Sequence, residues 1–240
     1  NINTAPEPVL QQALLLMGVD GGAVTPVVNS IIDWIDPDDA RRVEGAESAF
    51  YEKFDPPFQA KNGPIDDISE LLLIRGVGPE LYWGAASTNN PPGLLQERLR
   101  ENANPFNQQS LITVGLVDLF TPVSSGRLNI NTASVEALQI IPGMNEIIAG
   151  EIVAARTGEF DPMTGMGGPF LNLSPQYLWS RVPSLRLDIA QGLAQFADVR
   201  SRTFEVEIQA RVGTSSRTYY ATIVRNNPRD LPVINFYWKM

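Results

Sequence analysis

Hydrophobic residues recur at the three- and four-residue steps of an amphipathic helix through about residue 200 of this chain. Within residues 127–160 two such helical stripes stand on either side of Pro142-Gly143, which is expected to end the first helix. Thr132 is placed to cap the first helix, and Asn145 is placed to cap the second. The stripes consist of Val135, Leu138, Ile141, Ile148, Ile152 and Ala155. Two short helices joined by a tight turn predict a helix-hairpin-helix.

The five residues that open this segment, Asn129-Ile130-Asn131-Thr132-Ala133, also open the chain at residues 1–5. In the first copy Thr4 and Glu7 have the spacing of a capping box. An apolar stripe follows, and Gly18-Val19-Asp20 stands at the hairpin position before a second helix over residues 25–35. The chain therefore contains an internal repeat of two helix-hairpin-helix units.

The period of the pattern changes to two near the C-terminus, where apolar and polar residues alternate from Thr203 to Val212. Further strands are expected over residues 219–224 and 233–238, which together give a small antiparallel sheet. Phe204, Val206, Ile208 and Val212 share one face of the first strand and need a hydrophobic cover. The sequence predicts an α+β fold with a helical domain over residues 1–200 and a sheet domain over residues 201–240.

Composition narrows the possible chemistry. The net charge of −9 disfavours attraction to phosphate, so we expect no nucleic-acid partner, although a helix-hairpin-helix DNA-binding module is the alternative function. With no histidine and no cysteine, imidazole catalysis, the usual zinc sites and disulfides are excluded. Carboxylate pairs such as Asp38 with Glu47, or Asp66 with Asp67, are the remaining acid–base candidates. Because no matched set accompanies them, we expect no enzyme.

Six carboxylates lie within a short stretch after the second predicted helix, and only two arginines oppose them. Counted from Asp36, Asp38 is third and Glu47 is twelfth, which is part of the calcium-loop spacing, although Arg41 stands where that loop requires glycine. The alternative is an exposed acidic turn. Asp161, in the glycine-rich loop over residues 158–169, is a weaker second candidate. The predicted calcium ligands are Asp33, Asp36, Asp38, Asp39, Glu44 and Glu47.

Several segments together resemble a known family over nearly the whole chain. They are the paired Asn-Ile-Asn-Thr-Ala segments, residues 30–36 with Gly45-Ala46-Glu47, residues 70–74 with Gly76-Val77, and the closing strands. In this order they resemble the protein K family of the bacterial type II secretion pathway. The resemblance implies a minor pseudopilin, in which a pilin-type sheet carries a large helical domain that binds calcium.

The same resemblance implies where such a protein works and with what. It implies a membrane helix ahead of Asn1, anchorage in the bacterial inner membrane, and a periplasmic location for residues 1–240. It further implies that other minor pseudopilins are the partners, and that they share the tip of the pseudopilus, which supports protein export across the outer membrane. The chain is expected to be a structural subunit of that tip.

Overall fold

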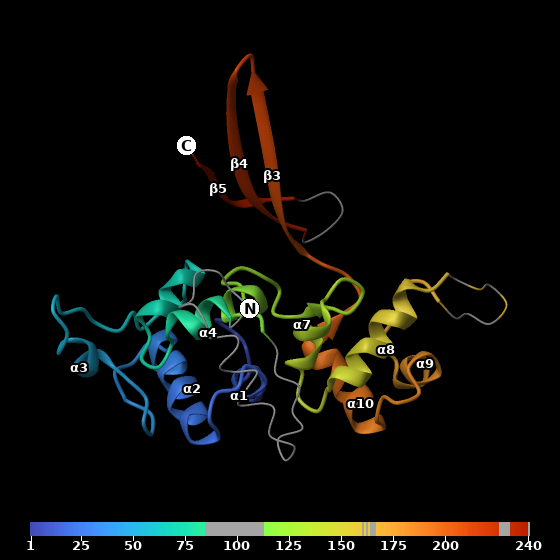
Figure 1. Ribbon diagram of the computed structural model, residues 1–240, viewed down its shortest axis with the longest axis horizontal. Coiled ribbons are helices and arrows are strands. Elements are labelled where there is room, and N and C mark those ends of the chain that lie inside the picture. Colours follow the sequence, from blue (N-terminus) through green and yellow to red (C-terminus); the bar gives the residue numbers. More distant parts are fainter. Residues whose placement is uncertain (85–112, 160, 162, 164–166, 226–230, 240) are drawn as a thin grey trace.

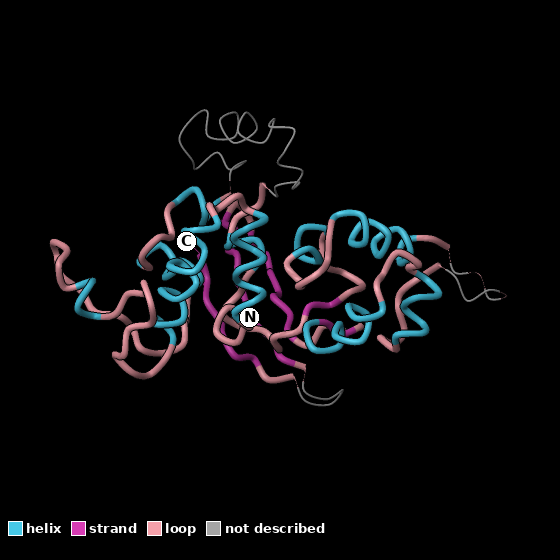
Figure 2. The backbone as a smooth tube through the Cα atoms, turned by 90° about the horizontal axis from the view of Figure 1, so that it is seen from below, coloured by secondary structure: helices cyan, strands magenta, loops and turns pink. Residues whose placement is uncertain are grey.

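The computed structural model describes the chain except for residues 85–112, 160, 162, 164–166, 226–230 and 240. The described helices form a broad body, and a three-stranded antiparallel sheet rises from its middle (Figure 1). Figure 2, the view from below, places the helices of the two sequence halves on opposite sides of this body. Helices and an antiparallel sheet in separate parts of one chain make the fold α+β, as predicted.

The first half begins with helices α1 (Glu7–Leu16) and α2 (Gly21–Ile35), which form the predicted hairpin. Gly18 has a φ of 80° at the turn, and the Asp20 carboxylate accepts a hydrogen bond from the Gly22 amide at 2.9 Å. With this cap, α2 begins at Gly21, four residues before the predicted start at residue 25. The predicted Thr4–Glu7 capping box is wrong, because the N-cap of α1 is Pro6, whose side chain offers no acceptor.

Short elements complete this half. They are α3 (Ser48–Tyr51), the 3₁₀ helix η1 (Ile68–Leu73), α4 (Pro79–Trp83) and α6 (Leu116–Leu119). A capping box formed by Asp67 and Glu70 starts η1. The long connection between α2 and η1 carries the acidic residues singled out above, and only α3 interrupts it.

The second half contains α7 (Val135–Gln139), α8 (Glu146–Thr157), α9 (Pro175–Arg181) and α10 (Leu187–Phe196). Asn145 caps α8 as predicted, through a 2.9 Å bond from the Ile148 amide. Thr132 does not cap α7; Ser134 does, accepting from the Ala137 amide. The reason is that the amides of Thr132 and Ala133 both donate to Asn129 O, and this turn delays the helix. The sequence did not predict α10.

Each half has its own buried cluster of apolar side chains. The first is built on α1, α2 and the segments around α4 and α6, and the second on α7 to α10. Ile2 and Ile130, the second residues of the two repeats, are buried in equivalent places, one in each cluster. Phe196 packs against both clusters, so the two halves meet along a hydrophobic contact.

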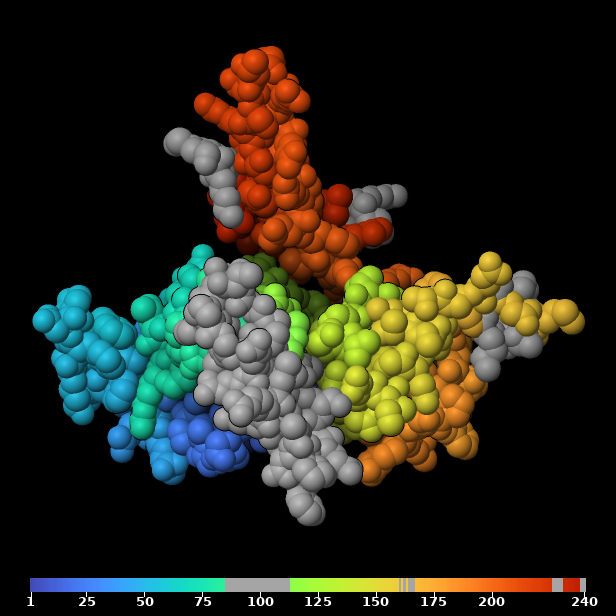
Figure 3. Space-filling view, viewed as in Figure 1, coloured from blue at the N-terminus to red at the C-terminus, as the bar shows by residue number. Residues whose placement is uncertain are grey.

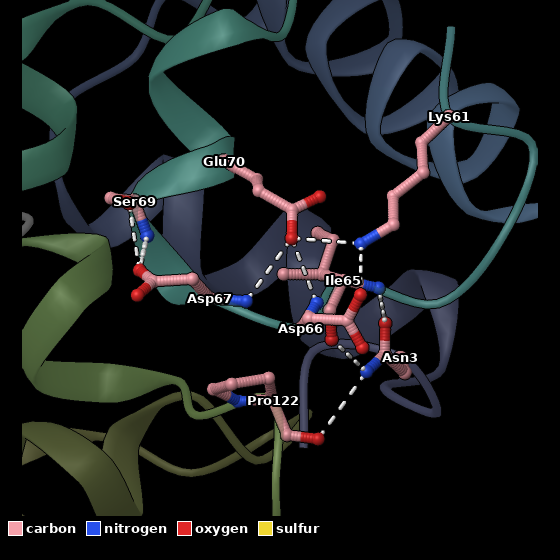
Figure 4. A network of polar contacts seen from close by, with 8 residues as sticks. All are labelled: Asn3, Lys61, Ile65, Asp66, Asp67, Ser69, Glu70 and Pro122. Atoms are coloured by element: carbon pink, nitrogen blue, oxygen red, sulfur yellow. Dashed lines mark hydrogen bonds and ion pairs between the residues drawn. The ribbon is translucent and has the colours of Figure 1, made fainter. Parts of the chain in front are cut away.

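The third residue of each repeat, an asparagine, fastens its half together. Asn3 Oδ1 accepts from the Ile65 amide at 2.7 Å, while its side-chain nitrogen donates to Ile65 O and Pro122 O (Figure 4). Asn131 does the same with the Phe170 amide, Phe170 O and Val199 O. One side chain thus satisfies three backbone groups from two distant segments. The internal repeat is therefore structural and extends well beyond the five identical residues.

The remaining contacts in Figure 4 fix the start of η1. Lys61 Nζ lies 2.6 Å from Asp66 Oδ2 and 2.8 Å from Glu70 Oε1. Burial opposes ionisation of Glu70, but hydrogen bonds from Lys61 and from the amides of Asp67 and Asp66 outweigh it and hold its pKa below the ordinary value. Hydrogen bonds from Ser69 lower the pKa of Asp67. Asp66 and Asp67 are therefore engaged in an ion pair and a helix cap.

A two-residue parallel ladder, absent from the prediction, joins β1 (Leu128–Asn129) to β2 (Ala197–Asp198). The projecting sheet consists of β3 (Thr203–Val212), β4 (Ser215–Val224) and β5 (Val233–Lys239), in that order, and all its pairs are antiparallel. The predicted meander is confirmed, although β4 begins at Ser215 because the hairpin turn is shorter than expected. The connection over residues 226–228, predicted as a turn, lies outside the described residues.

One face of this sheet is apolar and open. The register places Val206, Ala221 and Phe236 in one row across the strands, with Ile208 and Phe204 in neighbouring rows. Phe204 is 41% exposed, Ile208 50% and Phe236 55%. Figure 3 shows the sheet standing clear of the helical body over most of its length. The face that the sequence predicted to need a hydrophobic cover is therefore largely exposed in this structure.

Candidate metal centre

The acidic loop is anchored at both ends by buried elements. Helix α2 ends with Asp33 and Trp34 in the core, and Glu47 is the N-cap of α3. The Trp34 ring meets the buried Tyr51 ring edge-on at 5.3 Å, which joins α2 to α3 beneath the loop. Arg75, after η1, donates from Nη1 to Glu44 O and Gly45 O and so holds the part of the loop that leads back to α3. The end of α2, the start of α3 and the Arg75 side chain thus hold the loop in place.

Asp36, Asp38 and Glu47 converge in this loop, with one carboxylate oxygen of each lying within 4.8 Å of the others. These are the first, third and twelfth positions of the spacing noted in the sequence. Oxygen atoms gathered at this separation are the donors that Ca²⁺ prefers. Asp36 is half-buried, Asp38 is exposed and Glu47 is buried, so the group faces outward on one side.

Both carboxylate oxygens of Glu47 and one of Asp36 lack hydrogen-bond partners among the described residues, while Arg42 Nε lies 3.8 Å from the other Asp36 oxygen. Glu47 is only 3% exposed, and neither of its carboxylate oxygens has a hydrogen-bond partner there; the same holds for Asp36 Oδ1. Burial, followed by the nearby charges of Asp33, Asp36, Asp39 and Asp38, raises the pKa of Glu47 to about 7. Burial also raises the pKa of Asp36. Buried carboxylates without donors are costly, and a divalent cation would satisfy them.

Asp33 has a different part in this arrangement. Its side chain is completely buried, and its carboxylate accepts from the Arg42 amide at 3.2 Å, while Arg42 Nε lies 3.8 Å away. Burial raises the pKa of Asp33, although hydrogen bonds from the amides of Arg42 and Ala46 oppose that shift. The backbone of Gly45 lies directly against this carboxylate, with no room for a Cβ. Asp33 therefore shapes the loop from beneath.

The other two predicted ligands lie outside the convergent group. Asp39 and Glu44 are both exposed, and Glu44 has a φ of 59°, so the chain reverses there. Sequence reasoning missed Asn62, whose side-chain nitrogen donates to Asp38 O at 2.8 Å and whose side-chain oxygen is buried with no partner among the described residues. Its φ of 46°, typical of asparagine, belongs to a turn in which Gly63 and Pro64 follow it.

The glycine-rich loop contributes less to a metal site. Asp161 is exposed and its carboxylate accepts from the Met163 amide at 2.9 Å, but most of its neighbours lie outside the described residues. The acidic loop follows the second helix of the first hairpin. The loop that follows the second helix of the second hairpin instead contacts an arginine side chain, that of Arg181. The buried Arg181 guanidinium donates to Ala155 O and Gly168 O, both at 2.6 Å, and stacks on the Phe170 ring.

The hairpin turns are poorly suited to phosphate. In the glycine-rich turn before α4, the Glu80 carboxylate occupies the space beside Gly78, where a bound phosphate would approach. At the second hairpin, Glu146 is exposed in the first turn of α8, so the positive end of that helix already has a carboxylate. The net charge of −9 adds to this repulsion.

Two family models match parts of this chain. Residues 1–86 match the family model described as type II secretion system protein K, and residues 123–167 match that of the helix-hairpin-helix motif. The helix-hairpin-helix motif is thereby confirmed, whereas its use in DNA binding is not favoured. No helix among the described residues combines the length and apolar character needed to cross a bilayer.

The curated relatives are secretion proteins. Over 77 residues the chain is 36% identical to a putative type II secretion system protein K of Escherichia coli K12. Over the same length it is 29% identical to type II secretion system protein K of Pectobacterium carotovorum. Each match covers 32% of this chain and 24% of the relative, so the matched region spans about a quarter of those proteins.

A solved structure shares the fold over the whole chain. The crystal structure of the GspK-GspI-GspJ complex from the type 2 secretion system of enterotoxigenic Escherichia coli matches with a TM-score of 0.60 and 18% identity. The match covers 100% of this chain and 75% of that one. The family model, the curated relatives and the shared fold together confirm the resemblance of this chain to protein K of the type II secretion system.

Proposed function

We propose that this chain is the periplasmic region of a minor pseudopilin, a structural subunit at the tip of the type II secretion pseudopilus. One observation carries the proposal: over its full length the chain shares its fold with a protein solved in complex with GspI and GspJ. The partners are then the corresponding minor pseudopilins. In this role the protein supports export across the outer membrane, is anchored in the inner membrane, and catalyses no reaction.

The open face of the sheet supports this role. Phe204, Ile208 and Phe236 leave about half of their surfaces in water on a sheet that the helical body does not cover. An apolar face of this kind is suited to contact with another protein. A partner helix lying across the strands would bury these side chains. The sheet is therefore the side from which the subunit joins its neighbours.

The helical body supports a position at the end of a filament. It is much broader than the projecting sheet, so it would obstruct any subunit stacked on that side (Figure 3). A subunit of this shape ends a filament and occurs once in it. A DNA-binding role is the competing proposal, and it has to overcome the carboxylates placed at the hairpin turns.

The test is to mix the purified chain with the periplasmic regions of its cognate GspI and GspJ counterparts. We expect a stable complex by size-exclusion chromatography and by calorimetry. The double variant Ile208→Ser plus Phe236→Ser should weaken it, whereas the same change at the exposed Leu187 and Trp179, on the helical body, should not. Binding of duplex DNA at physiological salt, with no pseudopilin complex, would instead favour the DNA-binding module.

We further propose that Asp36, Asp38 and Glu47 bind calcium. The proposal is supported by their convergence and by the buried carboxylate oxygens without partners. Bound calcium would supply positive charge to the three carboxylates and tie the loop after α2 to the start of α3. Asp33, Arg75 and Gly45 would position the loop without contacting the ion. Asp39 and Glu44, with no convergent partner, are not included in this proposed set.

A further inference from the structure

Four arginines gather where the helical body meets the sheet, in a chain whose net charge is −9. Arg127 precedes β1, Arg200 and Arg202 lie in the segment between β2 and β3, and Arg225 follows β4. All four are exposed. Since the acidic loop lies in the opposite half of the body, this group is separate from the candidate metal centre.

These arginines line two adjoining hollows. The larger, about 770 Å³, is lined by Arg200, Arg202 and Arg225 together with Leu171 and Phe204. The second, about 410 Å³, is lined by Arg127, Arg202, Asp198 and Ser125. Because Arg202 and Asp198 line both, the two form one surface feature, which we name the arginine cleft. Each hollow has more volume than a single phosphate or carboxylate would fill.

The fold places like charges in neighbouring positions here. Thr203 pairs with Val224 at the start of the β3–β4 ladder, and one step further the Arg225 amide donates to Arg202 O at 2.6 Å. Arg202 and Arg225 therefore stand opposite one another on the adjacent segments that precede β3 and follow β4, an arrangement that destabilises a sheet unless an anion offsets it. Within the described part of the chain, the ion pair that reaches this group is Arg202 Nη2 with Asp198 Oδ2, at 3.9 Å.

The walls of the cleft also offer apolar surface. Leu171 is 69% exposed and Phe204 is 41% exposed, and they stand among the guanidinium groups. Asn129, Thr132 and Ser201 add polar groups along the floor. Guanidinium groups recognise carboxylates through paired hydrogen bonds. Four arginines against the single aspartate Asp198 give the cleft an excess of positive charge, which attracts ligands of the opposite sign. Apolar walls beside them favour a chain with mixed side chains over an inorganic anion.

We propose that the arginine cleft binds an acidic peptide segment of a partner protein, in which carboxylate side chains neighbour apolar ones. The carboxylates pair with Arg200, Arg202 and Arg225, and the apolar side chains pack on Leu171 and Phe204. Phe204 also begins the open apolar face of the sheet, so one partner can occupy both surfaces. The inference is independent of the proposed function, because it concerns the chemistry of the partner and not its identity.

The probe is a fluorescein-labelled peptide in which glutamates alternate with leucines and glycines, compared with the same peptide carrying glutamines in place of glutamates. Fluorescence anisotropy with the complete chain should detect binding of the acidic peptide only. Arg200→Gln plus Arg225→Gln should weaken binding roughly tenfold, since each removes a carboxylate contact. The matched control, Arg211→Gln plus Arg217→Gln, removes the same charge from exposed positions of the hairpin and should change affinity less than about twofold.

Melting curves of both variants ensure that the comparison is made on folded protein. Equal losses in the two variants would reduce the effect to net charge and overturn the proposal. So would equal binding of the acidic and glutamine peptides, or no binding of either. Vesicles containing phosphatidylglycerol form the last arm: if they bind through Arg200 and Arg225 while the acidic peptide does not, the cleft recognises lipid headgroups and the peptide proposal is wrong.

Discussion

Calcium should stabilise this chain, and Glu47→Gln should remove most of that stabilisation. Glu47 is the buried member of the convergent group, and both of its oxygens lack partners among the described residues. The matched control is Glu44→Gln. Glu44 lies three residues before Glu47, is exposed and is outside the group, so the variant removes the same charge without changing the site. The double variant Asp38→Asn plus Glu47→Gln should abolish the response to calcium entirely.

The size of the effect follows from mass action. For a loop site with three carboxylates we take a dissociation constant of about 10 μM. At about 1 mM calcium the ion concentration is then about 100 times this constant. An ion that binds only the folded state then stabilises it by about 2.7 kcal/mol. For a chain of this length about 1 kcal/mol shifts the melting temperature by roughly 2–4 °C, so the expected rise is roughly 5–10 °C.

Protons compete with calcium for this site. Because the pKa of Glu47 is raised from 4.5 to about 7, the ion-free folded protein binds a proton that the unfolded chain has already lost. The ion-free protein should therefore lose stability as pH rises from 4.5 to about 7. Calcium needs the ionised carboxylate, so its stabilising effect should be larger at about pH 8 than at about pH 5.5.

The assay is scanning calorimetry of the wild type and the three variants, with calcium or with excess chelator, at both pH values. Identical melting temperatures of the wild type in calcium and in chelator would refute the site and leave an acidic turn. A loss in Glu44→Gln as large as in Glu47→Gln would show that the loop responds to net charge, contrary to the geometry of the group.

Three further predictions concern the scaffold of both halves. Gly45→Ala should destabilise the protein by roughly 1–3 kcal/mol in urea unfolding, because its methyl group would overlap the Asp33 carboxylate, whereas Gly192→Ala, in open space on α10, should stabilise it slightly. Asn131→Ala should lower the free energy of unfolding by roughly 2–3 kcal/mol in the same assay, because it leaves three backbone groups without this partner. A loss no larger than that caused by replacing an exposed asparagine with alanine would contradict this role of Asn131. The carboxyl of Glu70 has a lowered pKa, so wild-type stability should fall as pH drops below 4.5, and Glu70→Gln should show a shallower fall; parallel pH curves would exclude this contribution.

Local patterns in the sequence determined the elements and their class. The three- and four-residue spacing predicted both hairpins, and alternation from Thr203 predicted β3, because a helix and a strand place side chains on one face with fixed periods. Asn145 was predicted correctly as a cap, since a cap acts on amides within three residues. The division into domains near residue 200 stays a prediction.

The tertiary structure decided where distant residues meet. The sequence spacing singled out Asp36, Asp38 and Glu47 among six predicted ligands, but only the path of the loop, held by Arg75 and by the buried Asp33, brings their carboxylates together. Helix starts moved for the same kind of reason. Thr132 is a good cap by composition, but the asparagine turn ahead of it consumes the first amides and shifts the cap to Ser134.

The arginine cleft lay entirely beyond the reach of sequence reasoning. Its residues come from three separate segments, before β1, between β2 and β3, and after β4, and none of them forms a motif. Periodicity records which face of an element a residue occupies, because that depends on neighbouring peptide geometry. Which faces and loops come to lie together depends on long-range strand pairing and on the clamps made by Asn3 and Asn131, and that information exists only in the folded chain.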